Sequence, residues 1–156
     1  MSGYGTDEGF EDYCDANGYA VPNGSVPAAR ARGSAFVDGA YGDRFTGVPT
    51  DGVDQDRAWP RTGATAFGQA ILSTLVPKRV EHAAYEAALI EMQTPGSLSA
   101  VVTGSARVVR EKVGELEVQY ANPGADAVAD ATPVVTAIEG LLAPLLRRPG
   151  LGVMVV

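Results

Sequence analysis

The chain has 156 residues, which suits a single domain, and its 19 glycines and 10 prolines indicate much loop. Its net charge of −7 is uneven, because residues 1–56 hold ten acidic and three basic residues while residues 57–156 hold nine of each. This balance argues against tight general binding of nucleic acid, and the sequence has no basic stripe longer than a pair. The single cysteine excludes an internal disulfide. We expect no signal peptide and no membrane partner.

Two helices are predicted in the first third of the chain. Residues 6–17 begin with Thr6, whose hydroxyl suits an N-cap, and acidic residues follow it in the first turn. Residues 25–41 form a second helix that starts at Ser25 and carries an apolar stripe. The stripe includes small residues such as Gly33, which favour close packing against a neighbour.

Residues 42–76 hold Gly, Pro and Asp at short intervals and show no sustained period. We expect a long ordered loop here, with Trp59 as its anchor in the core. A second interpretation makes Trp59-Pro60-Arg61 an aromatic and basic platform for single-stranded nucleic acid. Because such platforms usually offer several aromatic side chains, the anchor is the favoured interpretation.

Two further helices are predicted. Residues 77–93 are apolar on two sides, which suits a central helix with a neighbour on each side. The last helix opens at Thr132-Pro133, and Pro144 should kink or restart it. The predicted fold is therefore mainly α: a small bundle of about four helices with a protruding β-hairpin and an extended C-terminal tail. One domain covers residues 1–148, and the tail covers 149–156.

The hairpin, over about residues 107–121, is indicated by two alternating runs around Gly114-Glu115. In the predicted register Lys112 faces Glu117 and Val113 faces Leu116. One face is charged, with Arg110, Lys112 and Glu117, and the other is apolar, with Val109, Val113, Leu116, Val118 and Tyr120. Because a two-stranded ribbon is marginal alone, the apolar face needs a partner surface.

No pattern in the sequence indicates catalysis or a cofactor. His82 is the only histidine, and with Glu86 it supplies two of the three or more ligands that a metal site needs. Asp51, Asp54 and Asp56 lack the closing glutamate of a calcium loop. We therefore expect a protein that is not an enzyme and that has no catalytic residues, no metal and no cofactor.

Four stretches, over residues 32–47, 57–64, 109–121 and 139–146, resemble in order and spacing the head–tail connector proteins of tailed bacteriophages. Members of this adaptor or head-completion family often carry the label DnaT-like single-stranded-DNA-binding protein. The resemblance implies a virion protein of the neck, present in the host cytoplasm before assembly. It also implies a ring of about twelve copies that binds the portal and the next neck or tail protein.

The expected function is therefore that of a structural adaptor that extends the DNA channel toward the tail. DNA would pass an acidic wall without specific binding, and the apolar face of the hairpin would contact a neighbouring subunit. The tail would dock on the portal through Leu151, Val153, Met154, Val155 and Val156. The alternative is a single-stranded-DNA-binding accessory protein of replication, which would show salt-sensitive affinity for oligonucleotides.

Overall fold

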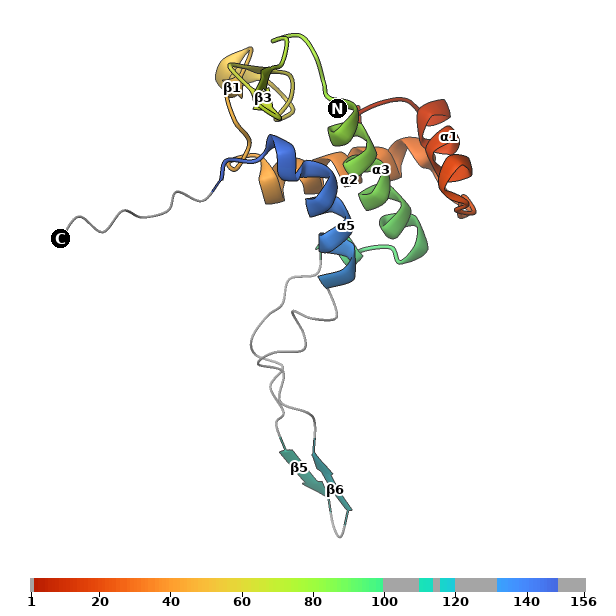
Figure 1. Ribbon diagram of the computed structural model, residues 1–156. Coiled ribbons are helices and arrows are strands. Elements are labelled where there is room, and N and C mark those ends of the chain that lie inside the picture. The colour runs from red at the N-terminus through yellow and green to blue at the C-terminus, as the bar shows by residue number, and fades with distance from the viewer. Residues whose placement is uncertain (1, 100–109, 114–115, 120–131, 149–156) are drawn as a thin grey trace, which may run out of the picture.

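The computed structural model describes residues 2–99, 110–113, 116–119 and 132–148. Four helices dominate this part of the chain: α1 (Asp7–Asn17), α2 (Val26–Tyr41), α3 (Lys78–Gln93) and α5 (Thr132–Leu142). Figure 1 shows α2, α3 and α5 side by side, with α1 at one end and short strands at the other. The predicted mainly helical fold is confirmed. No described helix is long and apolar enough to span a bilayer.

The first two helices start at the predicted caps. The Thr6 hydroxyl accepts a hydrogen bond from the backbone N–H of Gly9 at 2.9 Å, and Ser25 accepts one from Ala28 at 3.4 Å. Each bond satisfies a backbone donor that the first turn of a helix leaves without a partner. Gly18 ends α1 in the left-handed region, with φ of 72°.

The helices α2 and α3 cross in direct backbone contact at Gly33. A Cβ atom on this glycine would lie 2.5 Å from the carbonyl oxygen of Ala84 and 2.7 Å from the amide nitrogen of Ala88. Real Cβ atoms do not approach other atoms this closely, so the crossing requires glycine. The close packing expected from the small residues of this stripe is confirmed.

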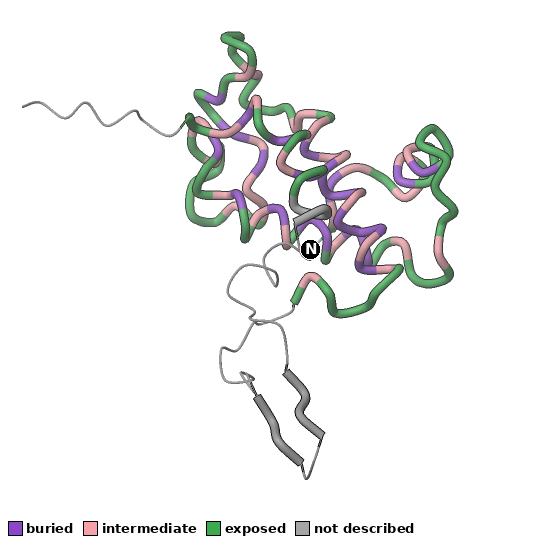
Figure 2. The backbone as a smooth tube through the Cα atoms, turned by 60° about the horizontal axis from the view of Figure 1, so that its bottom comes forward, coloured by how far each residue is buried: buried purple, intermediate pink, exposed green. Residues whose placement is uncertain are grey.

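The helix α3 is buried on two sides, as its sequence predicts. Val80 and Ala83 pack in the larger cluster, where α5 and the 3₁₀ turn η3 (Ala143–Leu145) contribute Ile138, Leu142 and Leu145. Tyr85 and Leu89 face a smaller cluster with Phe10 and Cys14 of α1. Figure 2 shows buried residues concentrated along the helices of this layer. The hydrophobic effect therefore holds three helices to one central helix.

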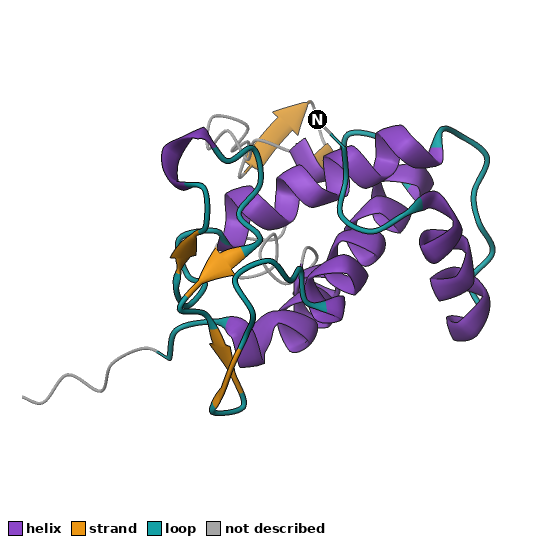
Figure 3. Ribbon diagram, turned by 90° about the horizontal axis from the view of Figure 1, so that it is seen from above, coloured by secondary structure: helices purple, strands orange, loops and turns teal. Residues whose placement is uncertain are grey.

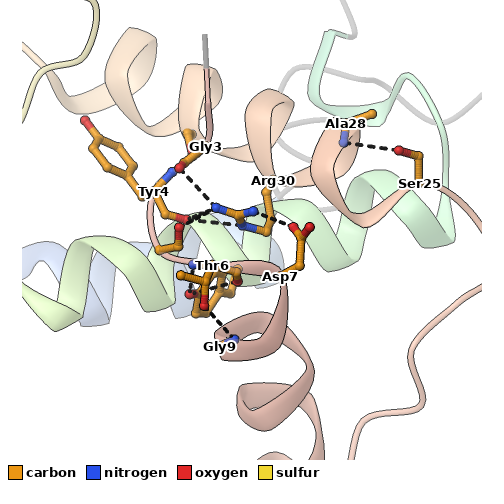
Figure 4. Close-up of polar contacts among 11 residues, drawn as sticks. Gly3, Tyr4, Thr6, Asp7, Gly9, Ser25, Ala28 and Arg30 are labelled. Carbon is orange, nitrogen blue, oxygen red and sulfur yellow. Dashed lines mark hydrogen bonds and ion pairs between the residues drawn. The ribbon is translucent and has the colours of Figure 1, made fainter.

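The buried Arg30 fixes the N-terminal segment to α2 (Figure 4). Its guanidinium donates to the carbonyl oxygens of Gly3, Tyr4 and Gly5 and forms an ion pair with Asp7. A buried charge is costly unless it is paired and hydrogen-bonded, and both conditions are met here. The start of α1 is thereby held in place.

Trp59 lies in the larger cluster with only 2% of its surface exposed, and its ring meets Phe45 edge-on at 5.5 Å. Its backbone N–H donates to the Tyr4 hydroxyl at 3.1 Å. That hydroxyl in turn donates to Asp38, which also accepts from Arg57 at 3.3 Å. The loop that carries Trp59 is therefore tied both to α2 and to the N-terminal segment.

The expectation of a plain loop over residues 42–76 is corrected in detail. β1 (Val48–Pro49) pairs antiparallel with β2 (Arg61–Thr62), and β3 (Thr65–Ala66) pairs antiparallel with β4 (Gln69–Ala70). The 3₁₀ turn η1 (Gly52–Asp54) lies between β1 and β2. Figure 3 shows these short ribbons at one end of the helical layer. Strands of two residues are too short to produce an alternating pattern, which explains why the sequence shows none.

The later hairpin consists of β5 (Arg110–Val113) and β6 (Leu116–Gln119) and has the predicted register, with Lys112 opposite Glu117 and Val113 opposite Leu116. The predicted turn, Val109, Tyr120 and the tail over 149–156 lie outside the described residues. A third 3₁₀ turn, η2 (Ser97–Ser99), follows α3. Helix α5 ends at Leu142, and η3 continues through Pro144, which agrees with the expected restart.

We predict opposite effects for two alanine substitutions on α2. Gly33→Ala forces the backbones of α2 and α3 apart, and overpacking of this kind costs about 1–3 kcal/mol of unfolding free energy. Gly39→Ala meets no atom within 4 Å and should stabilise the helix by about 1 kcal/mol through propensity alone. Urea unfolding of both variants measures the difference. Equal effects would show that the crossing does not depend on glycine.

We also predict that Trp59→Ala lowers the unfolding free energy by about 3–5 kcal/mol, because the truncation leaves a cavity in the larger cluster. The matched control is Phe67→Ala in the same loop region, where the ring is 73% exposed and its removal should leave the melting temperature nearly unchanged. Thermal melts of the two variants check this. Similar melts for Trp59→Ala and the wild type would contradict burial of the indole.

Candidate functional site

A pocket of about 490 Å³ opens between the β3–β4 ribbon and the segment that follows α5. Its size falls in the range of about 300–1,000 Å³ typical of ligand pockets. Among the described residues its lining contains no acidic side chain; we call it the arginine pocket, lined by Thr46, Thr65, Ala66, Phe67, Gly68, Ala143, Pro144, Leu146, Arg147 and Arg148.

The two walls of the arginine pocket are joined by backbone hydrogen bonds. The N–H of Thr46 donates to the carbonyl oxygen of Leu145 at 3.1 Å, and the N–H of Arg147 donates to that of Arg44 at 2.7 Å. The Thr46 hydroxyl also bonds to both backbone groups of Thr65 in β3. The ribbon and the end of the helical region are therefore held at a fixed separation.

Phe67 stands at the tip of the β3–β4 ribbon. Phe67 and Gly68 form a two-residue turn in which both backbone φ angles are positive, 51° and 74°. Such a turn favours Asn or Gly at its first position, because a bulky side chain there is strained. Among the described residues, Phe67 is the only residue other than glycine with a positive φ. Its ring is nevertheless 73% exposed, so it adds little to the core that would offset this strain.

Arg79 of α3 lies over the ring of Phe67, with its guanidinium carbon 5.2 Å from the ring centroid. It also donates to the carbonyl oxygen of Leu141 at 3.3 Å, which keeps the guanidinium in place. The guanidinium of Arg79 thus covers one side of the exposed Phe67 ring. This arrangement suits a planar, electron-rich ligand next to a negative charge.

Arg147 and Arg148 supply positive charge on the opposite wall. Both are exposed, and Arg147 donates from Nε to the carbonyl oxygen of Phe45 at 3.1 Å. Neither forms an ion pair with a described carboxylate. Their guanidinium groups therefore keep donors for a ligand anion.

A fourth arginine, Arg61, lies next to the pocket and is 4% exposed. Its hydrogen-bond partners are backbone carbonyl oxygens, among them Thr46 at 2.9 Å and Gly47 at 2.8 Å, and its guanidinium carbon lies 5.9 Å from the centroid of the Phe45 ring. Burial lowers the pKa of Arg61, and the positive charge of Arg147 lowers it further. Arg61 also has no ion-pair partner in the described part of the chain.

Among the residues whose side chains the structure describes, every other lysine or arginine forms an ion pair. The pairs are Arg30–Asp7, Arg32–Glu91, Arg44–Glu139, Arg57–Asp38 and Lys78–Glu81. The four side chains without a carboxylate partner, Arg61, Arg79, Arg147 and Arg148, all lie in or beside the arginine pocket. The fold therefore concentrates positive charge that the sequence disperses. Sequence analysis missed this site, because its members lie in three separate segments.

One signal in the sequence could have identified the tip of the β3–β4 ribbon. Phe67-Gly68 is flanked by Thr65-Ala66 and Gln69-Ala70, and glycine at the second turn position favours a tight hairpin. Of the aromatic and basic stretch singled out from the sequence, only Arg61 lies near the pocket. Trp59 and its neighbour Pro60 do not line the arginine pocket, so the platform interpretation of Trp59-Pro60-Arg61 finds only Arg61 near it.

The structure places His82 and Glu86 against Tyr13 of α1. His82 packs against Tyr13 with ring centroids 4.7 Å apart, and the Tyr13 hydroxyl donates to Glu86 at 2.7 Å. Burial, followed by this hydrogen bond, raises the pKa of Tyr13 well above its ordinary value. No group of three or more metal-binding side chains exists among the described residues, and the loop aspartates at 51, 54 and 56 are exposed.

Cys14 is buried in the smaller cluster. Burial raises the pKa of its thiol, and the nearby carboxylates of Glu86, Asp15 and Glu11 raise it further. A thiol of this kind is a poor nucleophile at neutral pH. Cys14 therefore serves packing in this fold.

Comparison with known proteins corrects the sequence-based assignment. Residues 2–156 match the family described as "Putative DnaT-like ssDNA binding protein". No curated protein and no solved structure matches the chain.

The match overturns the connector resemblance, and with it the expected ring at the portal, the neck location and the passage of DNA without binding. The resemblance rested on short stretches that hold common turn and helix patterns. The acidic balance of residues 1–56 had then favoured passage over binding. The match covers nearly the whole chain, so the chain belongs to the DnaT-like single-stranded-DNA-binding family.

Proposed function

We propose that this protein binds single-stranded DNA and that the arginine pocket is its binding site. The observation that carries the proposal is the convergence of Arg61, Arg79, Arg147 and Arg148, all without carboxylate partners in the described part of the chain, beside an exposed Phe67. Membership in a family described by this activity supports it. The role is one of binding, with no catalytic step.

The arginine side chains suit phosphate groups. A guanidinium donates two parallel hydrogen bonds to phosphate oxygens, and such charge-assisted bonds are stronger than neutral ones. Arg147 and Arg148 are exposed and adjacent in the chain, so they can contact successive phosphates of one strand. Binding would release counterions from the DNA, which makes the affinity depend on salt.

Phe67 suits a base. An exposed aromatic ring stacks on any unpaired base, which accounts for binding that depends on strandedness more than on sequence. In a duplex the bases are stacked on one another and their faces are covered. Because Arg79 covers one side of the Phe67 ring, we expect a single base to stack on the other side.

The net charge of −7 is compatible with this role. Five carboxylates are engaged by the five ion pairs described above, and several others lie on α1 at the far end of the layer from β3 (Figure 1). Attraction of phosphate depends on the local potential, which decays over about 8–10 Å at physiological salt. A basic pocket therefore works within an acidic protein, though association will be slower than for a basic one.

We predict that Phe67→Ala weakens binding of a fluorescent oligo(dT) by about 1–3 kcal/mol, the value of one base stacked on an aromatic side chain. Leu72→Ala is the matched control, because Leu72 is also 73% exposed and does not line the pocket. Fluorescence anisotropy at fixed salt measures both. Equal affinities for Phe67→Ala and Leu72→Ala would exclude stacking at Phe67.

A second prediction concerns salt. If three arginines contact phosphates, the logarithm of the binding constant should fall with the logarithm of salt concentration with a slope of about −2. Arg148→Ala should make this slope shallower by about 0.7. Arg44→Ala removes the same charge from an exposed pair with Glu139 and should leave the slope unchanged. A wild-type protein with no salt-dependent affinity for oligo(dT) would refute the proposed function.

A further inference from the structure

Arg61 differs from the other buried arginine in the chemistry of its partners. Arg30 is 7% exposed and is neutralised by Asp7. Arg61 is 4% exposed and donates from its three nitrogens only to carbonyl oxygens, those of Thr46, Gly47 and Ala58, at 2.8–3.1 Å. Carbonyl dipoles satisfy the donors of Arg61, but they leave its charge without a counterion in the described part of the chain.

This lack of a counterion is costly for the free protein. A buried charge loses hydration, and the neighbouring Arg147 adds repulsion, in agreement with the lowered pKa of Arg61. An anion bound beside Arg61 and Arg147 would relieve both effects. Arg61 therefore favours an occupied pocket over an empty one.

Arg61 also determines where the pocket wall lies. Its Nε group holds the carbonyl oxygen of Thr46, and the hydroxyl of Thr46 donates to the carbonyl oxygen of Thr65 at 3.1 Å and accepts from its N–H at 3.0 Å. Thr65 begins β3, the strand that leads to the tip. A chain of hydrogen bonds thus runs from a buried charge to the ribbon that carries Phe67.

We infer that Arg61 is a positioning residue of the DNA site, which holds the β3–β4 ribbon through Thr46 and adds positive charge beneath bound phosphate. This inference rests on the proposed function. Arg61 itself does not contact the strand, because it is buried. The two contributions, charge and hydrogen bonding, can be separated by substitution.

The test compares Arg61→Lys with Arg61→Met. Both variants lose the guanidinium fork and should lose thermal stability to a similar degree, but only the lysine keeps the charge. For variants that fold, we expect Arg61→Met to bind oligo(dT) about tenfold more weakly than the wild type, and Arg61→Lys within about threefold of it. Arg30→Met, at the paired arginine, should lose stability without this loss of affinity.

Equal affinities for folded Arg61→Lys and Arg61→Met would overturn the inference, because loss of the hydrogen bonds alone affects both variants alike and the charge of Arg61 would then add nothing to binding. In that case wild-type binding to oligo(dT) would still stand, so the proposed function would survive. Absence of wild-type binding would refute the proposed function itself.

A measurement on the wild type covers the case in which neither variant folds. Addition of oligo(dT) should shift the Nε–H resonance of Arg61 in the NMR spectrum and leave that of Arg30 in place. An unchanged Arg61 resonance in a saturated complex would contradict the inference.

Discussion

The contact of α2 and α3 at Gly33 is the constraint on which the rest of the structure depends. The two backbones can touch because glycine has no side chain. A Cβ atom at this position would lie 2.5 Å from the carbonyl oxygen of Ala84. The alanine-rich face of α3 is then close enough to pack on α2 on one side and on α5 on the other. The larger cluster that results receives Trp59, and the loop of Trp59 leads directly into the ribbons that form the pocket.

Charge pairing gives the molecule its second level of organisation. Five basic side chains are neutralised by carboxylates, including the partly buried pairs at Arg30 and Arg57 that fasten the N-terminal segment and the Trp59 loop. Among the residues whose side chains the structure describes, four arginines have no such partner, and they gather at one place. In a chain with a net charge of −7, positive side chains left without acids next to an exposed aromatic ring are more readily explained by an anionic ligand than by folding.

Much of the fold is predictable from local chemistry. The helix termini are set by neighbouring residues, namely Thr6, Ser25 and Pro144. The hairpin register follows from the alternation around Gly114. In each case the cause and its effect lie within the same short segment. The burial of α3 on two sides is also visible in its own composition. Local patterns of this kind require no knowledge of how the chain folds back on itself.

The site was not predictable in the same way. Arg61, Arg79 and Arg147 are separated by 18 and 68 positions and are brought together only by the packing of α5 and the loop onto α3. The two-residue strands β3 and β4 leave no periodic signal, so the exposed position of Phe67 depends on a turn that sequence analysis did not predict. Net charge was misleading because it averages over the whole molecule, in which five of the described basic side chains are paired with carboxylates and four are not.

The most direct test is to find where a bound strand touches the protein. An oligonucleotide that carries 5-iododeoxyuridine, crosslinked by light and followed by digestion and mass spectrometry, identifies the residue next to a base. The arginine pocket predicts crosslinks in the segment of residues 62–78, at Phe67, and their loss as salt is raised. Crosslinks confined to other segments, such as the β5–β6 hairpin, would contradict the assignment of the DNA site to the arginine pocket.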